Sequence, residues 1–193
     1  MFLFDILPIF SDDAYLTAYF ADAFVNGNGF PNSNTVTLLG ITDPLYLYLV
    51  SLLIFIGLDS VFSVHLLNYL AIFLIFSLIR REKGNLALLA VFLFFSLWYH
   101  LLIGAGNGLF ILFFLLYLVD YRKRSFLWLS LATATRFDFA LYWLFVFVQK
   151  YIKQDFEWCK KSLYSFMPIL LLNFVFWGTL MPNTLLSKKL MYG

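Results

Sequence analysis

The 193-residue chain carries a net charge of only +2, and it is 63% hydrophobic, 22% aromatic and 12% charged. A soluble domain has about a quarter charged residues, so this composition excludes an ordinary soluble domain and predicts an integral membrane protein. One cysteine and two histidines exclude a disulfide framework and a Cys/His metal centre. No nucleic-acid-binding motif stands out, so nucleic acid is not an expected partner.

Residues 1–43 are expected to form an external loop with a short helix at residues 14–25, which turns Tyr15 and Tyr19 toward the membrane. Asp12 and Asp13 precede this helix. Adjacent carboxylates beside a membrane domain are costly unless water, a cation or a substrate holds them. The pair is therefore either the chemical centre, with a divalent cation as a possible companion, or simply an acidic helix start.

A second helix is predicted at residues 44–56, where Asp43 can cap the first turn and Pro44 suits it. At 1.5 Å per residue it reaches about 20 Å, which is short of a membrane core about 30 Å thick. Tyr46 and Tyr48 are typical interfacial anchors. We therefore expect this helix to lie at the outer membrane face.

Three apolar segments at residues 60–79, 86–103 and 109–119 are expected to cross the membrane in turn. A glycine-rich turn separates the last two, and its Asn107 could either bind sugar or cap the following helix. Lone histidines in apolar helices more often serve helix packing. Of the two histidines, His65 and His100, His100 is the better ligand candidate because it is expected near the outer face.

Residues 126–148 are long enough for one span, but Arg136 and Asp138 stand at its centre. Charges at the bilayer midplane are expensive and usually mark a cavity or a break. Two half-helices meeting at residues 135–138 would explain both charges, with Asp138 orienting Arg136. A last span at residues 163–177 leads to a polar exit segment at residues 178–193.

The basic residues predict the orientation. Ten of the 13 lysines and arginines fall in three clusters, at residues 80–83, 122–124 and 150–161. The positive-inside rule puts all three clusters in the cytoplasm. That requires residues 44–56 not to span and residues 126–148 to enter and return. The remaining basic residues, Arg136, Lys188 and Lys189, then face the outer side, which suggests an anionic ligand there.

Five short motifs occur in order along the chain. They are Asp12, Asp13, Ala14 and Tyr15; Gly40, Ile41, Thr42, Asp43, Pro44 and Leu45; Gly104, Ala105, Gly106 and Asn107; Thr135, Arg136, Phe137 and Asp138; and Leu180, Met181, Pro182, Asn183 and Thr184 with Lys188. Taken together, they resemble the motifs of the polyprenyl-phosphate-sugar-dependent glycosyltransferases of the GT-C fold, in particular the bacterial arabinofuranosyl- and mannosyltransferase-like branch. Phe137 and Asp138 stand where that pattern has Pro and Glu.

The resemblance implies an all-α polytopic membrane bundle in one transmembrane domain: an external catalytic loop (1–43), membrane helices (44–177) and an external exit segment (178–193) that continues in a longer parent. It implies transfer of a sugar from a lipid-linked donor to a glycan or protein acceptor, at the outer face of a bacterial inner membrane. Catalysis would fall to Asp12 or Asp13. The implied substrate-binding residues are Arg136, Asp138, Lys188, Asn183, Asp43, His100 and Asn107.

Two other classes remain open. A transporter or flippase for a lipid-linked anion would also explain a broken helix with a buried arginine. It explains less well an acidic pair in an external loop. A noncatalytic membrane scaffold is the third reading, and an assay of sugar transfer and leaflet movement separates the three.

Overall fold

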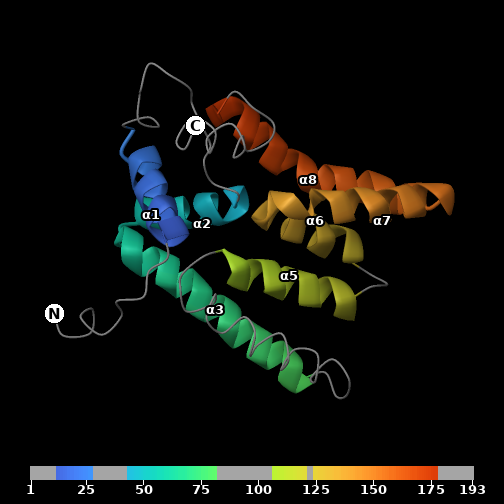
Figure 1. The fold of residues 1–193 in the computed structure, drawn as a ribbon, viewed down its shortest axis with the longest axis horizontal. Coiled ribbons are helices and arrows are strands. Elements are labelled where there is room, and N and C mark those ends of the chain that lie inside the picture. The colour runs from blue at the N-terminus through green and yellow to red at the C-terminus, as the bar shows by residue number, and fades with distance from the viewer. Residues whose placement is uncertain (1–11, 28–42, 82–105, 121–123, 178–193) are drawn as a thin grey trace.

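The computed structural model describes residues 12–27, 43–81, 106–120 and 124–177 (Figure 1). Every regular element within these ranges is helical, which confirms the all-α class. The segment predicted at residues 86–103 and the exit segment at 178–193 lie outside the described residues. The elements are α1 (Asp12–Val25), α2 (Pro44–Phe55), α3 (Ser60–Arg81), α5 (Asn107–Val119), α6 (Ser125–Thr135), the 3₁₀ helix η1 (Phe137–Phe139), α7 (Ala140–Ile152) and α8 (Phe156–Trp177).

Helix α1 packs against α2 and α3 through a face of small residues. Ala14, Ala18 and Ala21 are all buried, and their short side chains let the helix approach its neighbours closely. On the other side, Tyr15 and Tyr19 are each 59% exposed, as the sequence predicted. The helix begins at Asp12, so the acidic pair forms its first turn.

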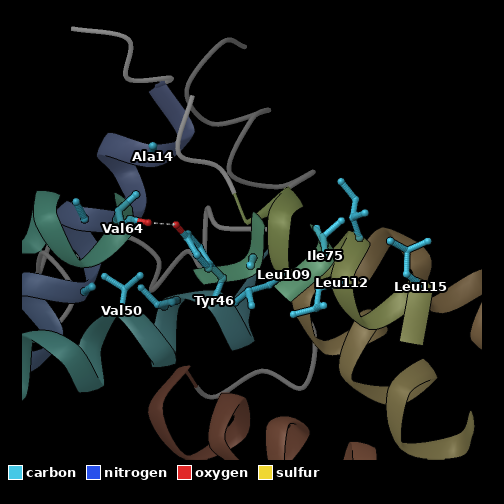
Figure 2. Close-up of a cluster of buried hydrophobic side chains, with 13 residues drawn as sticks. Ala14, Tyr46, Val50, Val64, Ile75, Leu109, Leu112 and Leu115 are labelled. Carbon is cyan, nitrogen blue, oxygen red and sulfur yellow. Dashed lines mark hydrogen bonds between the residues drawn. The ribbon is translucent and has the colours of Figure 1, made fainter. Parts of the chain in front are cut away.

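Helix α2 lies in the main hydrophobic core, where Tyr46, Leu47 and Val50 are fully buried (Figure 2). The prediction that Tyr46 is an interfacial anchor is wrong. Its ring packs inside the core, and its hydroxyl donates a 3.0 Å hydrogen bond to the Val64 carbonyl of α3. This bond satisfies the phenol hydroxyl. The tyrosine can therefore be buried in the core, although its amphipathic side chain is typical of an interface.

Helices α3 and α5 run side by side in the same direction (Figure 1). Tyr46 of α2 links their first halves, since it bonds to α3 and closely approaches Gly106 at the start of α5. Near their C-terminal ends, the side chains of Arg81 and Leu116 line the same groove. The ends of α3 and α5 therefore lie at one end of the bundle.

Helix α6 runs antiparallel to α5, because Trp128 donates to Asp120 at one end of the pair and Arg136 contacts Asn107 at the other. The chain then breaks at Arg136, and α7 returns alongside α8. This confirms the predicted half-helix break.

Helix α8 begins at Phe156 rather than at residue 163, because Asp155 accepts a hydrogen bond from the Trp158 amide and caps the helix. Bonds from Trp158 to Ser125 and between Ser130 and Ser162 show that α8 runs parallel to α6. Cys159 is a free cysteine, and it is buried.

These directions bring the described basic residues of all three clusters to one end of the bundle, which we call the basic end. They lie at the end of α3, the start of α6, the end of α7 and the start of α8. The start of α5 and the α6–α7 break lie at the opposite end. The residues at the basic end are Arg80, Arg81, Arg124, Lys150, Lys153, Lys160 and Lys161.

Among the described helices, α3 alone is both long enough and apolar enough to cross a membrane. Helices α2, α5 and α6 are apolar but shorter. Large apolar side chains nevertheless cover the outside of the bundle. Leu141 of α7 is 79% exposed, and Phe73 of α3 and Val175 of α8 are exposed to a similar degree. Extended apolar surface of this kind is rare on soluble monomers and typical of a surface that contacts lipid or another protein.

Candidate functional site

The break between α6 and α7 is a local change of backbone at Arg136. Helix α6 ends at Thr135, and Arg136 adopts an extended conformation with φ −134° and ψ 104°. The amide of Phe139 then bonds to the Arg136 carbonyl, which starts the short η1 turn. Arg136 consequently lies at the tip of a hairpin instead of the middle of a continuous helix.

The Arg136 guanidinium joins two other predicted site residues. Its Nε donates to Asp138 Oδ1 at 3.2 Å and its Nη2 to Asp138 Oδ2 at 2.8 Å, while Nη1 donates to Asn107 Oδ1. The two bonds to Asp138 form a bidentate pair, which fixes the plane of the guanidinium. The predicted contact of Asp138 with Arg136 is confirmed. The pair is partly exposed, at 32% and 59%, so solvent screens its attraction.

Asn107 is the first residue of α5, one position after the N-cap residue Gly106. Its side-chain oxygen accepts a hydrogen bond from Arg136, which follows a different helix, α6. Of the two roles left open for Asn107, the structure therefore does not support capping. Binding of sugar stays a prediction.

Asp43 also lies at the start of α5. It precedes α2, but its side chain forms no capping bond with that helix. A β-carbon built on Gly106 would lie 2.9 Å from Asp43 Oδ2 and 3.1 Å from the Tyr46 ring. The position thus favours glycine, because a β-carbon there would force the carboxylate or the ring to shift.

Burial and the nearby Asp43 carboxylate raise the pKa of Tyr46 above its usual value. The Tyr46 hydroxyl therefore remains protonated and keeps donating to the Val64 carbonyl. This bond anchors the first turn of α2, and with it Asp43, to α3.

Gly106 and Asn107 are consecutive residues, so Asp43 and Arg136 both lie close to the start of α5. The structure brings together four of the nine predicted site residues, Asp43, Asn107, Arg136 and Asp138, which we call the α5-start site. A phosphate at this site would share Arg136 with Asp138 and Asn107. The guanidinium would supply positive charge and a planar edge of hydrogen-bond donors, and the carboxylates could accept hydrogen bonds from hydroxyl groups.

The side chains of the other five predicted site residues lie outside what the structure describes. Asp12 and Asp13 form the first turn of α1, and their side chains lie outside what the structure describes. Ala14, next along the chain, is fully buried in the core cluster that contains Tyr46 and Leu109. His100, Asn183 and Lys188 lie outside the described residues. Within the described ranges, no group of three or more His, Cys, Asp or Glu residues could hold a metal ion.

Sequence reasoning did not assign Gly106 or Tyr46 to the site. The glycine-rich turn was a usable signal for Gly106, since clustered glycines often mark a close approach of other atoms to the backbone. For Tyr46 the sequence offered no such signal.

Comparisons of this chain with protein-family models, with curated proteins and with solved structures found no match.

Proposed function

We propose that this chain is a membrane glycosyltransferase, which moves a sugar from a polyprenyl-phosphate-linked donor to an acceptor hydroxyl on the outer face of a bacterial inner membrane. The observation that carries the proposal is the α5-start site, where Arg136 and Asp43 flank consecutive residues at the end of the bundle opposite the basic end. Under the positive-inside rule, that end faces outward.

In the proposed reaction, the acceptor oxygen bonds to the anomeric carbon of the donor sugar as the bond from that carbon to the phosphate oxygen breaks. The electron pair of the broken bond leaves with the lipid phosphate. Asp12 or Asp13 takes the acceptor proton as general base. Arg136 and Lys188 stabilise the charge that develops on the phosphate.

The remaining predicted residues orient the donor. Asp43, Asn107 and Asn183 are suited to bind sugar hydroxyls, since the oxygens of carboxylate and amide groups accept hydrogen bonds from them. His100 is a further candidate for such a hydrogen bond. Asp138 holds the Arg136 plane in position. The exposed apolar side chains of α3, α7 and α8 offer a surface for lipid and for the polyprenyl chain.

The test of the phosphate site is Arg136→Lys in the full-length protein. Lysine keeps the charge but cannot contact Asp138 in two places and Asn107 at once. We expect donor binding to weaken about ten- to a hundredfold, as for loss of a charge-assisted hydrogen bond. The matched control is Arg124→Lys, at an exposed arginine of the basic end. Unchanged donor binding in Arg136→Lys would return Arg136 to a purely structural partnership with Asp138.

The test of the acidic pair is Asp12→Asn and Asp13→Asn, made separately, with transfer of labelled sugar as the measurement. One of the two should reduce transfer about a hundredfold or more, the usual size of a general-base effect. Asp22→Asn, at an exposed carboxylate of the same helix, is the control. Parental rates in both variants would leave the pair as a helix start.

A transporter or flippase for a lipid-linked anion is the second candidate, and the hairpin with a charged tip favours it. Reconstitution in vesicles separates the two activities. Movement of the labelled lipid between leaflets, with no new glycoside formed, would support the transporter and contradict the transferase.

A further inference from the structure

Among the described residues, an apolar groove lies between α3 and α5, which we call the α3–α5 groove. Its volume is about 240 Å³. It lies along the second halves of the two helices, toward the basic end and away from the α5-start site. The lining residues are Leu74, Ser77, Leu78 and Arg81 of α3, with Leu112 and Leu116 of α5.

The walls of the groove are suited to a hydrocarbon chain. Four of its six lining residues are leucines. The fifth, Ser77, donates its hydroxyl to the Phe73 carbonyl of its own helix at 2.9 Å, so its polar group is already satisfied. Apart from Arg81 and the acceptor side of the Ser77 hydroxyl, these walls offer a polar ligand no partner, whereas an acyl chain would bury the leucines.

Arg81 gives the groove a charged end. It is the last residue of α3, and both it and the adjacent Arg80 are exposed. Within the described part of the chain, neither arginine forms an ion pair. An apolar channel that ends at an arginine is complementary to a molecule with an apolar tail and an anionic head.

We propose that the α3–α5 groove binds one acyl chain of an anionic glycerophospholipid, whose phosphate meets Arg81. Basic pockets between membrane helices on the cytoplasmic side bind anionic head groups. The proposal rests on the membrane location within the proposed function and is independent of sugar transfer. The bound lipid would come from the leaflet opposite the proposed sugar donor.

Lipid binding to the purified full chain in a zwitterionic detergent tests the proposal, with fluorescent phosphatidylglycerol as the probe. Arg81→Gln should weaken binding about tenfold or more, because a charge-assisted bond to phosphate is lost. Lys153→Gln removes an equal charge from the same end but off the groove, and should leave binding within about twofold. Phosphatidylcholine should bind more weakly than phosphatidylglycerol.

Filling the groove supplies a second variant that keeps Arg81. Ser77→Phe should weaken binding of phosphatidylglycerol, because the new ring occupies the space for the acyl chain. Ser165→Phe is its control, since Ser165 also donates to its own helix, at 2.8 Å, but on α8. Size-exclusion chromatography verifies that each variant is folded.

Three results would overturn the proposal. The first is equal weakening of phosphatidylglycerol binding in Arg81→Gln and Lys153→Gln, and the second is an equal affinity for phosphatidylcholine and phosphatidylglycerol. The third is full displacement of the probe by glycerol 3-phosphate at a concentration equal to that of the probe. Release of the chain from membranes by alkaline carbonate would also overturn it, because no leaflet would supply the lipid. Absence of sugar transfer with retained, Arg81-dependent lipid binding would contradict the proposed function and leave the groove proposal intact.

Discussion

At the scale of single residues, Gly106 allows Asp43 and Tyr46 to pack closely against the start of α5. A β-carbon at residue 106 would lie 2.9 Å from the Asp43 carboxylate oxygen and 3.1 Å from the Tyr46 ring, so one of these neighbours would have to shift. Helix α2, with Asp43 before it, therefore packs closely against the backbone at the start of α5, where the candidate ligand residues gather. A change of one methyl group at this position tests whether this close packing stabilises the fold.

We predict that Gly106→Ala destabilises the protein by about 1–3 kcal/mol, the usual cost of overpacking a tight core. The added Cβ must push away Asp43 Oδ2 or the Tyr46 ring. Thermal unfolding in detergent measures the change. Asp43→Ala in the Gly106→Ala background removes the nearest clash, so the double variant should lose less stability than the two single changes added together. Strictly additive losses would show that Asp43 and residue 106 do not interact.

Residue patterns predicted some contacts and missed others for physical reasons. Asp138 could be paired with Arg136 because the two are close in sequence and opposite in charge. The contact of Arg136 with Asn107 depends on how α5 and α6 pack as a pair, and the sequence carries no local signal for it. Tyr46 was misplaced because composition cannot tell a tyrosine at an interface from one whose hydroxyl finds a buried carbonyl.

Hydrogen bonds between polar side chains hold the helices of the second half together. Ser162 of α8 accepts a 2.9 Å bond from Trp143 of α7, and its hydroxyl lies 3.2 Å from that of Ser130 in α6. Both serines are fully buried. One side chain thus joins three helices, and the α6–α7 hairpin depends on it for its position against α8.

We predict that Ser162→Ala destabilises the protein by about 1–3 kcal/mol, because the buried indole N–H of Trp143 loses its acceptor. Ser165→Ala is the matched control. It removes the same atom from the same helix, but its hydroxyl bonds only to the Lys161 carbonyl. Chemical unfolding followed by tryptophan fluorescence measures both. Equal effects of the two substitutions would mean that the link between the three helices contributes little.

Helix positions were predicted well where length and charge constrained them. The break at Arg136 followed from the cost of charge inside a long apolar segment. The second helix was predicted from Pro44 at its first turn, and its short length indicated that it does not span. The start of α8 was missed because residues 156–162 contain charged side chains and read as a loop, whereas Asp155 caps a helix there.

For the whole molecule, the main feature is the gathering of basic residues at one end. The helix directions that produce it come from packing contacts, whereas the sequence argument used charge alone. The two agree for every described basic residue of the three clusters. Which side of a membrane this end faces is a prediction, and it can be tested directly.

We predict that single cysteines at Lys83, Arg124 and Lys153 are shielded from an impermeant thiol reagent added outside, and that cysteines at Asn28 and Asn183 are labelled. The reason is that a lipid bilayer would separate the basic end from the reagent. The native Cys159 is replaced by alanine first, although it is only 5% exposed. Permeabilised cells supply the control, where all five positions should react. Labelling at Lys153 but not at Arg124 would place α6 and α7 in one continuous span.

If the chain lies in a membrane, as proposed, the α6–α7 hairpin has a consequence for its insertion during synthesis. Helix α6 has 11 residues and α7 has 13, so each reaches only about 16–20 Å and neither could cross alone. The two would then be delivered by the translocon together, with Arg136 and Asp138 at the leading tip. Because these residues are two positions apart, their ion pair can form before any other helix is present. The hairpin would then carry a locally neutral tip through the hydrocarbon, and Arg136 would meet Asn107 only on arrival.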